Sequence, residues 1–350
     1  MSFSDLLADT TNYLHLNATF TDRLGLLDGK SAFALFLNNL GDEYYNQDVF
    51  ISFVEDILDQ ISVETSLSFG SGLCGVGIVL ENAVRTGTLD ADLSIVLAEV
   101  DSKIMSSIHE GSIDNIFISD GLSGYGLYLL ARCRSKSTNK DQLKQYRDSL
   151  SLLTDQILQK LHQPNIDTSY TTQIWNGTAG VFIFLVRIAS QSPQNSKIWS
   201  YVYLLRRRIF QSLVDTVHHW AHVEGWFTLI FFSTNDKELD QLIVTREFDT
   251  FLNWCHSNIK LLDFYEAGFY GLLLRLLGSR GLQRADEIAD CVFQMIVSNY
   301  EKQGIKVLYT IDPDNRSIPI GLQRGVCGSA IPLLSNLKMD FSWLWILGIY

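Results

Sequence analysis

Short glycine motifs, each followed by a run of apolar residues, recur along the whole chain. Their first glycines are Gly29, Gly72, Gly121, Gly177, Gly225, Gly268 and Gly325. Successive motifs are roughly 40 to 60 residues apart, which is the period of a repeat architecture. Five copies read Gly-x-x-Gly in full, whereas the first and fifth have Ala32 and Thr228 in place of the second glycine. The pattern therefore predicts one structural unit that is used seven times.

The segments between the motifs have the apolar spacing of amphipathic helices. Examples are the stretches 49–61, 93–108, 143–161 and 202–217. Each unit thus pairs one almost wholly apolar helix with one half-exposed helix, and this contrast predicts an inner and an outer layer. We expect an all-α fold, an α/α toroid in which seven inner helices are surrounded by seven outer helices.

Polar residues stand directly before several of the glycines. Asp28, Ser71, Asp120 and Asn176 are all suited to act as helix N-caps. The stretch 70–75 also fits the Gly-x-Gly-x-x-Gly pattern of a dinucleotide site. Because its Gly-x-x-Gly part recurs at four other places, we interpret this stretch as part of the repeat.

Composition and charge narrow the class of protein. A hydrophobic content of 47% is enough for two packed layers, and we expect one domain over residues 1–350. No uninterrupted apolar run reaches the roughly 18 residues of a membrane span, and the start of the chain does not read as a signal peptide. These features predict a cytoplasmic protein whose five cysteines are reduced thiols. A net charge of −12 disfavours nucleic acid as a partner.

The repeat, together with phrases such as Gly25-Leu-Leu-Asp-Gly-Lys30 and Asn176-Gly-Thr-Ala-Gly180, resembles the lanthionine synthetase C-like family. The resemblance runs from about Gly25 to Leu334 and includes all seven repeats in order. It implies a double-layered helical toroid. It also implies an activity of the family's enzymes, in which a peptide cysteine adds to a dehydroalanine or dehydrobutyrine and closes a thioether ring.

The resemblance further implies a zinc ion that holds the substrate sulfur as a thiolate. The family's ligands come from a Trp-Cys-x-Gly motif in the fifth repeat and a Cys-His-Gly motif in the sixth. Here Val223 stands at the first cysteine, and Glu266 and Ala267 stand at the Cys-His pair. Valine and alanine cannot bind a metal, so we predict no metal site and no cofactor in this chain.

Other residues at the mouths of the repeats are candidates for chemistry or binding. Asn176 stands where the family commonly has a histidine suited to acid–base catalysis, and Asp120 is the nearest acid in the third repeat. With His222, they are our candidate catalytic residues. We expect a central cavity that binds a peptide through Trp175, Glu224, Trp226 and Glu266.

These observations predict a member of the family that matures modified peptides, as a zinc-less peptide-binding accessory protein or a diverged cyclase. Its partners would be a modified precursor peptide and a peptide dehydratase or other modifying enzyme. Two alternatives remain open. One is a zinc-dependent cyclase with displaced ligands, in which His222 and Glu266 could share the metal. The other is an α/α-toroid glycosidase that uses Glu224 and Glu266 as its paired carboxylates.

Overall fold

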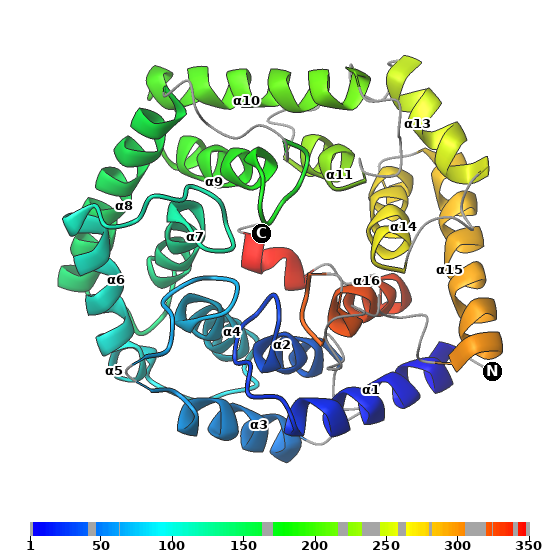
Figure 1. Ribbon diagram of the computed structural model, residues 1–350, viewed down its shortest axis with the longest axis horizontal. Helices are drawn as coiled ribbons and strands as arrows, with labels where there is room; N and C mark the ends of the chain where they lie inside the picture. The colour runs from blue at the N-terminus through cyan, green and yellow to red at the C-terminus, as the bar shows by residue number, and fades with distance from the viewer. Residues whose placement is uncertain are drawn as a thin grey trace.

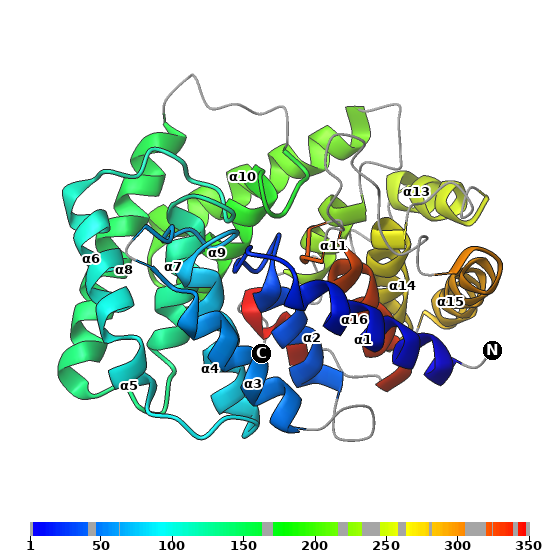
Figure 2. The ribbon, with the colours of Figure 1, turned by 60° about the horizontal axis from the view of Figure 1, so that its bottom comes forward.

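A computed structural model of the protein describes residues 3–40, 47–62, 64–162, 171–215, 223–232, 246–257, 264–279, 282–304, 320–323, 325–338 and 342–347. Every regular element within these ranges is a helix. The helices form two concentric rings, which are seen along the ring axis in Figure 1 and tilted by 60° in Figure 2. The expected all-α toroid is therefore confirmed.

The inner ring is built from the apolar helices that are associated with the glycine motifs. In chain order they are α2 (Lys30–Leu40), α4 (Leu73–Thr86), α7 (Leu122–Arg132), α9 (Thr178–Gln191), α11 (Val223–Phe231), α14 (Phe264–Ser279) and α16 (Val326–Lys338). These helices are covered on one side by the outer ring and on the other by their neighbours. In α7, for example, every residue from Leu122 to Arg132 is buried.

The outer ring contains the amphipathic helices. They are α1 (Phe3–Thr19), α3 (Gln47–Asp59), α5 (Leu93–Val96), α6 (Ala98–Glu110), α8 (Lys140–Leu161), α10 (Ser196–Asp215), α13 (Arg246–Ser257) and α15 (Gln283–Gln303). Each outer helix buries one stripe of apolar residues and exposes the rest. Helix α3 buries Phe50, Phe53, Val54 and Ile57, which follow the i, i+3, i+4, i+7 spacing of a single face.

The ring is closed by elements from the two ends of the chain. Helix α16 packs on α2, and the N-terminal helix α1 contacts α2, α15 and α16. In Figure 1, α1 occupies the outer position beside the seventh inner helix. The outer partner of the last repeat thus comes from the start of the sequence, so that each inner helix is covered on its outer side.

The C-terminal segment turns inward instead of adding another outer helix. The short 3-10 helix η4 (Ser342–Leu347) lies inside the inner ring, where it contacts α2, α4 and α7 (Figure 1). Trp343, Leu344, Ile346 and Leu347 are all at most 2% exposed. At the level of η4, the middle of the toroid is therefore packed with apolar side chains rather than open.

The loops before the inner helices are closed by backbone hydrogen bonds. The amide of Leu73 donates to Ser66, that of Leu122 to Asn115 and that of Cys327 to Ile320, each spanning seven residues. The N-caps of α4, α7 and α9 are the glycines themselves, and none of them makes a side-chain cap. The expectation that Ser71, Asp120 and Asn176 act as N-caps is therefore wrong, because loop carbonyls already accept from the first helical amides.

The fifth and sixth repeats depart from this arrangement. Helix α11 already includes Gly225 as its third residue, and α14 includes Gly268 as its fifth. At Gly29, Gly72 and Gly121, the first glycines of the first three repeats, a Cβ would meet a backbone carbonyl of the preceding loop. At Gly225 and Gly268 it would instead meet side chains, those of Leu213 and Thr172 and that of Pro332. These two glycines therefore lie inside their helices, whereas Gly72, Gly121 and Gly177 are the N-caps of theirs.

Two further expectations concern membranes and thiols. Within the described ranges, no helix combines the length and apolarity needed to cross a membrane. The five cysteines are free, and three of them, Cys74, Cys255 and Cys327, are buried. Burial raises the pKa of the Cys74 and Cys327 thiols well above its usual value, so these thiols stay protonated at neutral pH.

Candidate functional site

The loops that precede the inner helices meet in a ring around the toroid axis, which we call the rim. It comprises residues 24–29, 66–72, 115–121, 171–177 and 320–323. A series of backbone hydrogen bonds joins each loop to the next, from Leu322 to Leu26, from Leu27 to Gly70, from Gly70 to Ser119 and from Ser119 to Trp175, at 2.7 to 3.1 Å. Five of the seven repeats are thus fixed relative to one another through main-chain atoms.

Side-chain hydrogen bonds link the fourth-repeat loop of the rim to helices α11 and α14 of the fifth and sixth repeats. A carboxylate oxygen of Glu224 accepts from the backbone amide of Ile174 at 2.6 Å, and its other oxygen accepts from the Tyr265 hydroxyl at 3.0 Å. The indole nitrogen of Trp175 donates to the same hydroxyl at 3.0 Å. We call Trp175, Glu224 and Tyr265 the rim triad. It ties the fourth, fifth and sixth repeats together.

Glu224 and Tyr265 of the rim triad directly adjoin in sequence Val223 and Glu266, which the resemblance assigns to metal-ligand positions of the family. Val223 and Ala267, at 2% and 0% exposure, are packed into the apolar core. One helical turn below Tyr265, the ring of Phe269 packs on Tyr265 at 4.9 Å and on Trp343 of η4 at 6.3 Å between centroids. Aromatic side chains, Phe269 and then Trp343, thus connect the Tyr265 ring of the triad to η4.

The structure places the other predicted binding residues in different surroundings. Trp226 does not join the rim, because its indole packs on Phe210 of α10 and on Phe248 and Phe251 of α13. The sequence predicts that Trp226 lines a peptide-binding cavity, but in the structure it connects inner helix α11 to the outer helices α10 and α13. Glu266 is buried close to Cys255 of α13, whose pKa is raised by burial and, to a smaller extent, by the charge of Glu266.

His222, one of the candidate catalytic residues, lies outside the described residues. The other two share a contact at the rim. The Ser119 hydroxyl donates to the amide oxygen of Asn176 and, at 3.2 Å, to the carboxylate of Asp120. No hydrogen bond from the Asn176 amide nitrogen to another described residue is present. Asn176 is half-buried and Asp120 is exposed, so both side chains are at least partly accessible to solvent.

Negative charge gathers at this part of the rim. Burial raises the pKa of the Asp28 carboxyl; Arg23 and the backbone act to lower it, and the nearby Asp120 raises it further. One oxygen of Asp28 is buried without a hydrogen-bond partner among the described residues. Asp28, Asp120 and Glu224 therefore give the rim an acidic character, which favours positively charged or hydrogen-bond-donating ligands.

Comparison of the sequence with protein-family models identifies the family to which this chain belongs. The model of the family described as lanthionine synthetase C-like protein matches residues 21–257, which contain the first five repeats. The chain belongs to the lanthionine synthetase C-like family. The sixth and seventh repeats, which the motifs at Gly268 and Gly325 mark in the sequence, lie beyond the matched range. A search of curated proteins found no match.

Solved structures support the fold over the rest of the chain. Nisin cyclase superposes with a TM-score of 0.64, over 97% of this chain and 96% of that protein, at 14% sequence identity. At such low identity the likeness shows the fold and leaves the activity to be argued from residues. It does extend the lanthionine synthetase C-like architecture through the sixth and seventh repeats.

The residues at the family's zinc positions do not fit the metal. Zinc in proteins is bound by cysteine, histidine and carboxylate side chains. Val223 and Ala267 carry no donor atom, and Glu266 alone cannot form a three-ligand site. Among the residues that the structure describes, no group of three histidine, cysteine, aspartate or glutamate side chains is close enough to hold a metal ion.

Sequence reasoning missed Tyr265 and Ser119, which hold the rim residues in place. Tyr265 directly precedes Glu266 at a family ligand position, and that neighbourhood was the only available signal. Ser119 precedes Asp120 in the third repeat. Neither residue belongs to a motif with known chemistry, so only their hydrogen bonds reveal their role.

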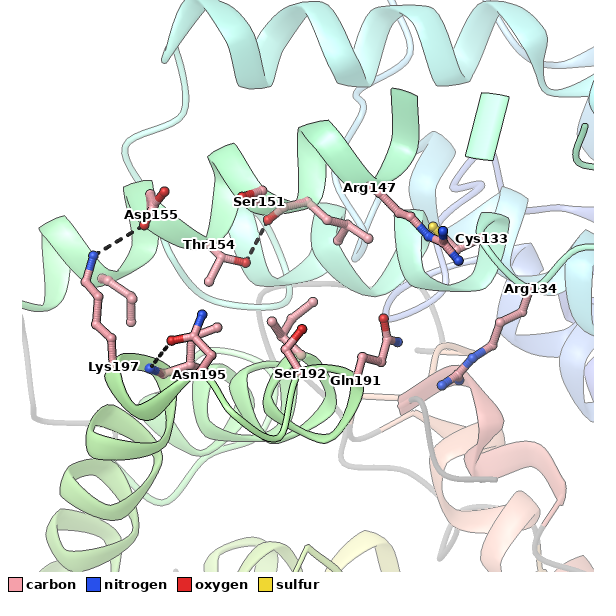
Figure 3. Close-up of a pocket in the computed structure, with 14 residues that line it drawn as sticks. Cys133, Arg134, Arg147, Ser151, Thr154, Asp155, Gln191, Ser192, Asn195 and Lys197 are labelled. Carbon is pink, nitrogen blue, oxygen red and sulfur yellow. Dashed lines mark hydrogen bonds and ion pairs between the residues drawn. The ribbon is translucent and has the colours of Figure 1, made fainter. Parts of the chain in front are cut away.

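A groove lies at the opposite end of the inner helices, between α8 and the connection from α9 to α10 (Figure 3). We call it the basic groove. It has a volume of about 640 Å³. It is lined by Cys133, Arg134, Arg147, Leu150, Ser151, Thr154, Asp155, Leu158, Ile188, Gln191, Ser192, Asn195, Lys197 and Ile198. Nothing in the sequence drew attention to it.

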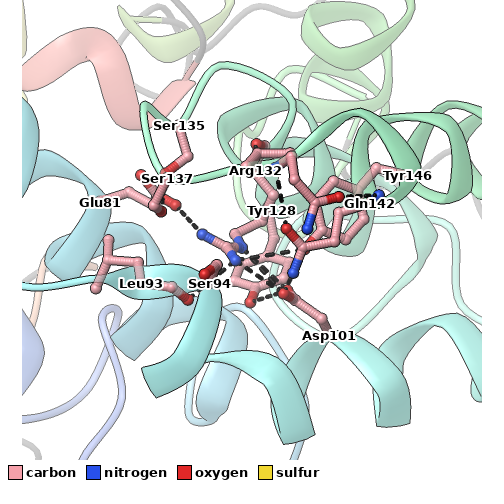
Figure 4. A network of polar contacts seen from close by, with 12 residues as sticks. Glu81, Leu93, Ser94, Asp101, Tyr128, Arg132, Ser135, Ser137, Gln142 and Tyr146 are labelled. Atoms are coloured by element: carbon pink, nitrogen blue, oxygen red, sulfur yellow. Dashed lines mark hydrogen bonds and ion pairs between the residues drawn. The ribbon is translucent and has the colours of Figure 1, made fainter.

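A buried charged cluster lies between α4, α6, α7 and α8 (Figure 4). The guanidinium of Arg132, which is 0% exposed, pairs with Asp101 at 2.9 Å and with Glu81. The hydroxyls of Tyr128 and Tyr146 donate to Asp101 at 2.6 and 2.5 Å. Every charged member thus has partners, and because the cluster is closed to solvent we interpret it as a structural link between the two rings.

Proposed function

We propose that this protein binds a dehydrated, cysteine-containing precursor peptide at the rim and does not itself close the thioether ring. The observation that carries the proposal is the rim triad, since Tyr265 and Glu224 form a hydrogen-bonded link to Trp175 beside the positions of the family's metal ligands. A site built for cyclisation would present metal donors there. Here the same place holds a hydrogen-bonded network in which Trp175 and Tyr265 are almost completely buried and Glu224 is half-buried.

The chemistry of ring closure supports this assignment. A cysteine thiol has a pKa of about 8.5, so only a small fraction is thiolate at neutral pH unless a metal or a base assists. Val223 and Ala267 cannot assist. Asn176 can donate a hydrogen bond to an enolate, yet an amide does not transfer a proton, and Asp120 is the remaining acid–base candidate at the rim.

The rim does, in contrast, carry polar side chains that can bind a peptide. The amide nitrogen of Asn176 can donate to a peptide carbonyl, while Asp120 and Glu224 can accept from peptide amides or pair with a basic side chain. The main-chain bonds of the rim hold these groups in place before the peptide arrives. Such preorganisation reduces the ordering cost of binding.

The reaction that supplies such a peptide is the dehydration of serine or threonine, so a peptide dehydratase is the expected neighbour, in the cytoplasm. An active zinc cyclase would need ligands such as His222, which the structure does not describe. A glycosidase would need Glu224 and Glu266 as a free carboxylate pair. No described contact favours either alternative, because Glu224 is engaged by Ile174 and Tyr265.

The test is a paired binding and cyclisation assay on a synthetic peptide that contains one cysteine and one dehydroalanine. Fluorescence anisotropy measures binding, and mass spectrometry after thiol capping measures ring closure. We expect saturable binding and no ring closure above the rate without protein. Asn176→Ala should weaken binding about fivefold, the loss of one hydrogen bond, whereas the exposed Asn253→Ala should not.

Three results would overturn the proposal. The first is protein-dependent, stereoselective loss of free thiol, since it would identify an active cyclase. The second is the absence of saturable binding for wild-type protein that is shown to be folded by circular dichroism. Equal weakening by Asn176→Ala and Asn253→Ala would place the peptide elsewhere on the surface.

A further inference from the structure

The basic groove is separated from the rim by the full length of an inner helix. Trp175 precedes the first turn of α9, whereas Gln191 of the groove is the last residue of that helix and Ser192 is its C-cap. A helix of this length spans roughly 20 Å. A ligand in the groove would therefore contact none of the rim residues, and the groove has to be explained by itself.

Its surface combines three kinds of side chain in an ordered way. Leu150, Leu158 and Ile198 are buried and form an apolar base. Hydroxyl and amide side chains stand on both sides, from α8 on one wall and from the α9–α10 connection on the other: Ser151, Thr154, Gln191, Ser192 and Asn195. Such a surface can accept apolar side chains and satisfy peptide backbone groups at the same time.

Positive charge is distributed along the groove. Figure 3 shows Arg147 beside Cys133 at one end and Lys197 at the other. Lys197 pairs with Asp155 at 3.4 Å, but both side chains are more than 60% exposed, so the pair is weak. Arg147 forms no ion pair with any described acid. With Arg134 included, the groove has a net charge of +2 on a chain whose net charge is −12.

The titration of neighbouring groups agrees with this field. Burial raises the pKa of Cys133 to about 11, while Arg147 and Arg134 act in the opposite direction, which places both guanidinium groups near the thiol. Burial lowers the pKa of Arg187, on α9, to about 10, and repulsion by Arg134 contributes. Arg134 therefore lies close to both Cys133 and Arg187, just beyond the carboxyl end of α7, where the helix dipole favours a cation.

We propose that the basic groove binds an extended peptide segment that carries acidic side chains. Acidic groups would pair with Arg147 and Arg134 at one end, and the segment's apolar side chains would cover Leu150 and Leu158. An extended chain fits better than a compact anion such as phosphate, because the cations lie at separate points along the groove and polar groups stand on both walls.

The proposal does not depend on chemistry at the rim, and its test can therefore fail independently. The probe is a fluorescein-labelled decapeptide in which aspartate and glutamate alternate with leucine, without cysteine or dehydrated residues. Its neutral twin has asparagine and glutamine at the acidic positions. Anisotropy titrations at low salt compare the wild-type protein with three variants. Arg147→Glu reverses a charge in the groove, and Ser151→Trp fills the groove without a change of charge. Lys144→Glu is the control. Lys144 is exposed on the same helix and does not line the groove.

We expect saturable binding of the acidic probe that weakens as salt is added. Arg147→Glu and Ser151→Trp should each weaken it about tenfold, and Lys144→Glu should change it less than twofold. Binding of the neutral twin should be at least about tenfold weaker. The melting temperature of each variant is measured in parallel, and both groove residues are exposed, so folding should be retained.

Four outcomes would overturn the proposal. The first is that the acidic probe does not saturate the protein, and the second is that the neutral twin binds as tightly as the acidic probe. The third is that Lys144→Glu weakens binding of the probe as much as Arg147→Glu does. The fourth is that millimolar phosphate displaces the probe and that this displacement also requires Arg147. The last would assign the groove to a small anion.

Discussion

The indole nitrogen of Trp175 donates a hydrogen bond of 3.0 Å to the hydroxyl of Tyr265, and so joins the fourth repeat to the sixth across the rim. Ninety residues separate the two in the sequence. Both are almost completely buried, and Glu224 of the fifth repeat accepts from the same hydroxyl. These side-chain hydrogen bonds thus extend to the fifth and sixth repeats the series of links that backbone hydrogen bonds form among the loops of the other five.

Replacing Tyr265 with phenylalanine should lower the free energy of unfolding by about 1–2 kcal/mol, because the change leaves a buried indole N–H and a carboxylate without their shared partner. Denaturant unfolding measures the effect. Tyr203→Phe is the matched control, since Tyr203 is 50% exposed on α10, and its change should stay within about 0.5 kcal/mol. Equal stability of wild type and Tyr265→Phe would mean that the triad does not stabilise the fold.

Replacing Arg132 with methionine should cost about 3–5 kcal/mol at neutral pH, because Asp101 and Glu81 would remain buried without their cation. Even with Arg132 present, burial holds the pKa of Glu81 above its usual value. Without Arg132 the pKa of Glu81 should rise further. The stability loss of the variant should therefore shrink as the pH falls through the Glu81 pKa, since protonation removes the buried charge. Lys144→Met on the exposed face of α8 serves as the control, and a pH-independent deficit would contradict this explanation.

Replacing Asp28 with asparagine should stabilise the protein at neutral pH by up to about 1 kcal/mol, since it removes a half-buried charge with an unpaired oxygen. The folded-state pKa of Asp28 lies above its unfolded value of 3.8. Its contribution to stability is therefore complete below pH 3.8 and is lost as the pH rises through the folded pKa. The gain of the variant should vanish at low pH in thermal melts, and exposed Asp148→Asn should show no such trend.

Glycine substitutions should separate three kinds of site. A Cβ at Gly180 would meet the backbone carbonyl of Ile174 and, at 2.9 Å, the side chain of Ile118, so Gly180→Ala should cost about 3 kcal/mol. At Gly271 a Cβ would meet the movable ring of Phe293 at 2.6 Å, and about 1 kcal/mol is expected. Gly87 has open space but φ of +82°, so its cost of about 1 kcal/mol is conformational. Equal losses of stability at Gly180 and Gly271 would mean that the backbone of the loop around Ile174 moves to accommodate the new Cβ.

Metal removal should leave the protein unchanged. With Val223 and Ala267 at the ligand positions, we expect well under one zinc per chain by elemental analysis after purification. We also expect no change of the melting temperature on adding a chelator, because no metal-binding free energy is lost. One tightly held zinc per chain, with a lower melting temperature after chelation, would favour the displaced-ligand cyclase.

The sequence by itself determined the architecture. Seven glycine motifs with alternating apolar and amphipathic helices leave few arrangements other than two helical layers, because each inner helix has no polar face to expose. The loss of metal donors at Val223 and Ala267 could also be read directly, since side-chain type alone decides whether an atom can bind zinc. Periodicity could not show that α1 would cover the seventh repeat or that η4 would enter the ring.

Only the tertiary structure decided which side chains form the rim. Trp226 and Trp175 both lie close to a motif glycine, yet one packs on the outer helices and the other reaches Tyr265. The difference arises because Trp226 follows Gly225 within α11, whereas Trp175 lies in the loop before Gly177 and α9. The basic groove likewise combines residues from three segments whose proximity is set by the packing of the two rings and by no local pattern.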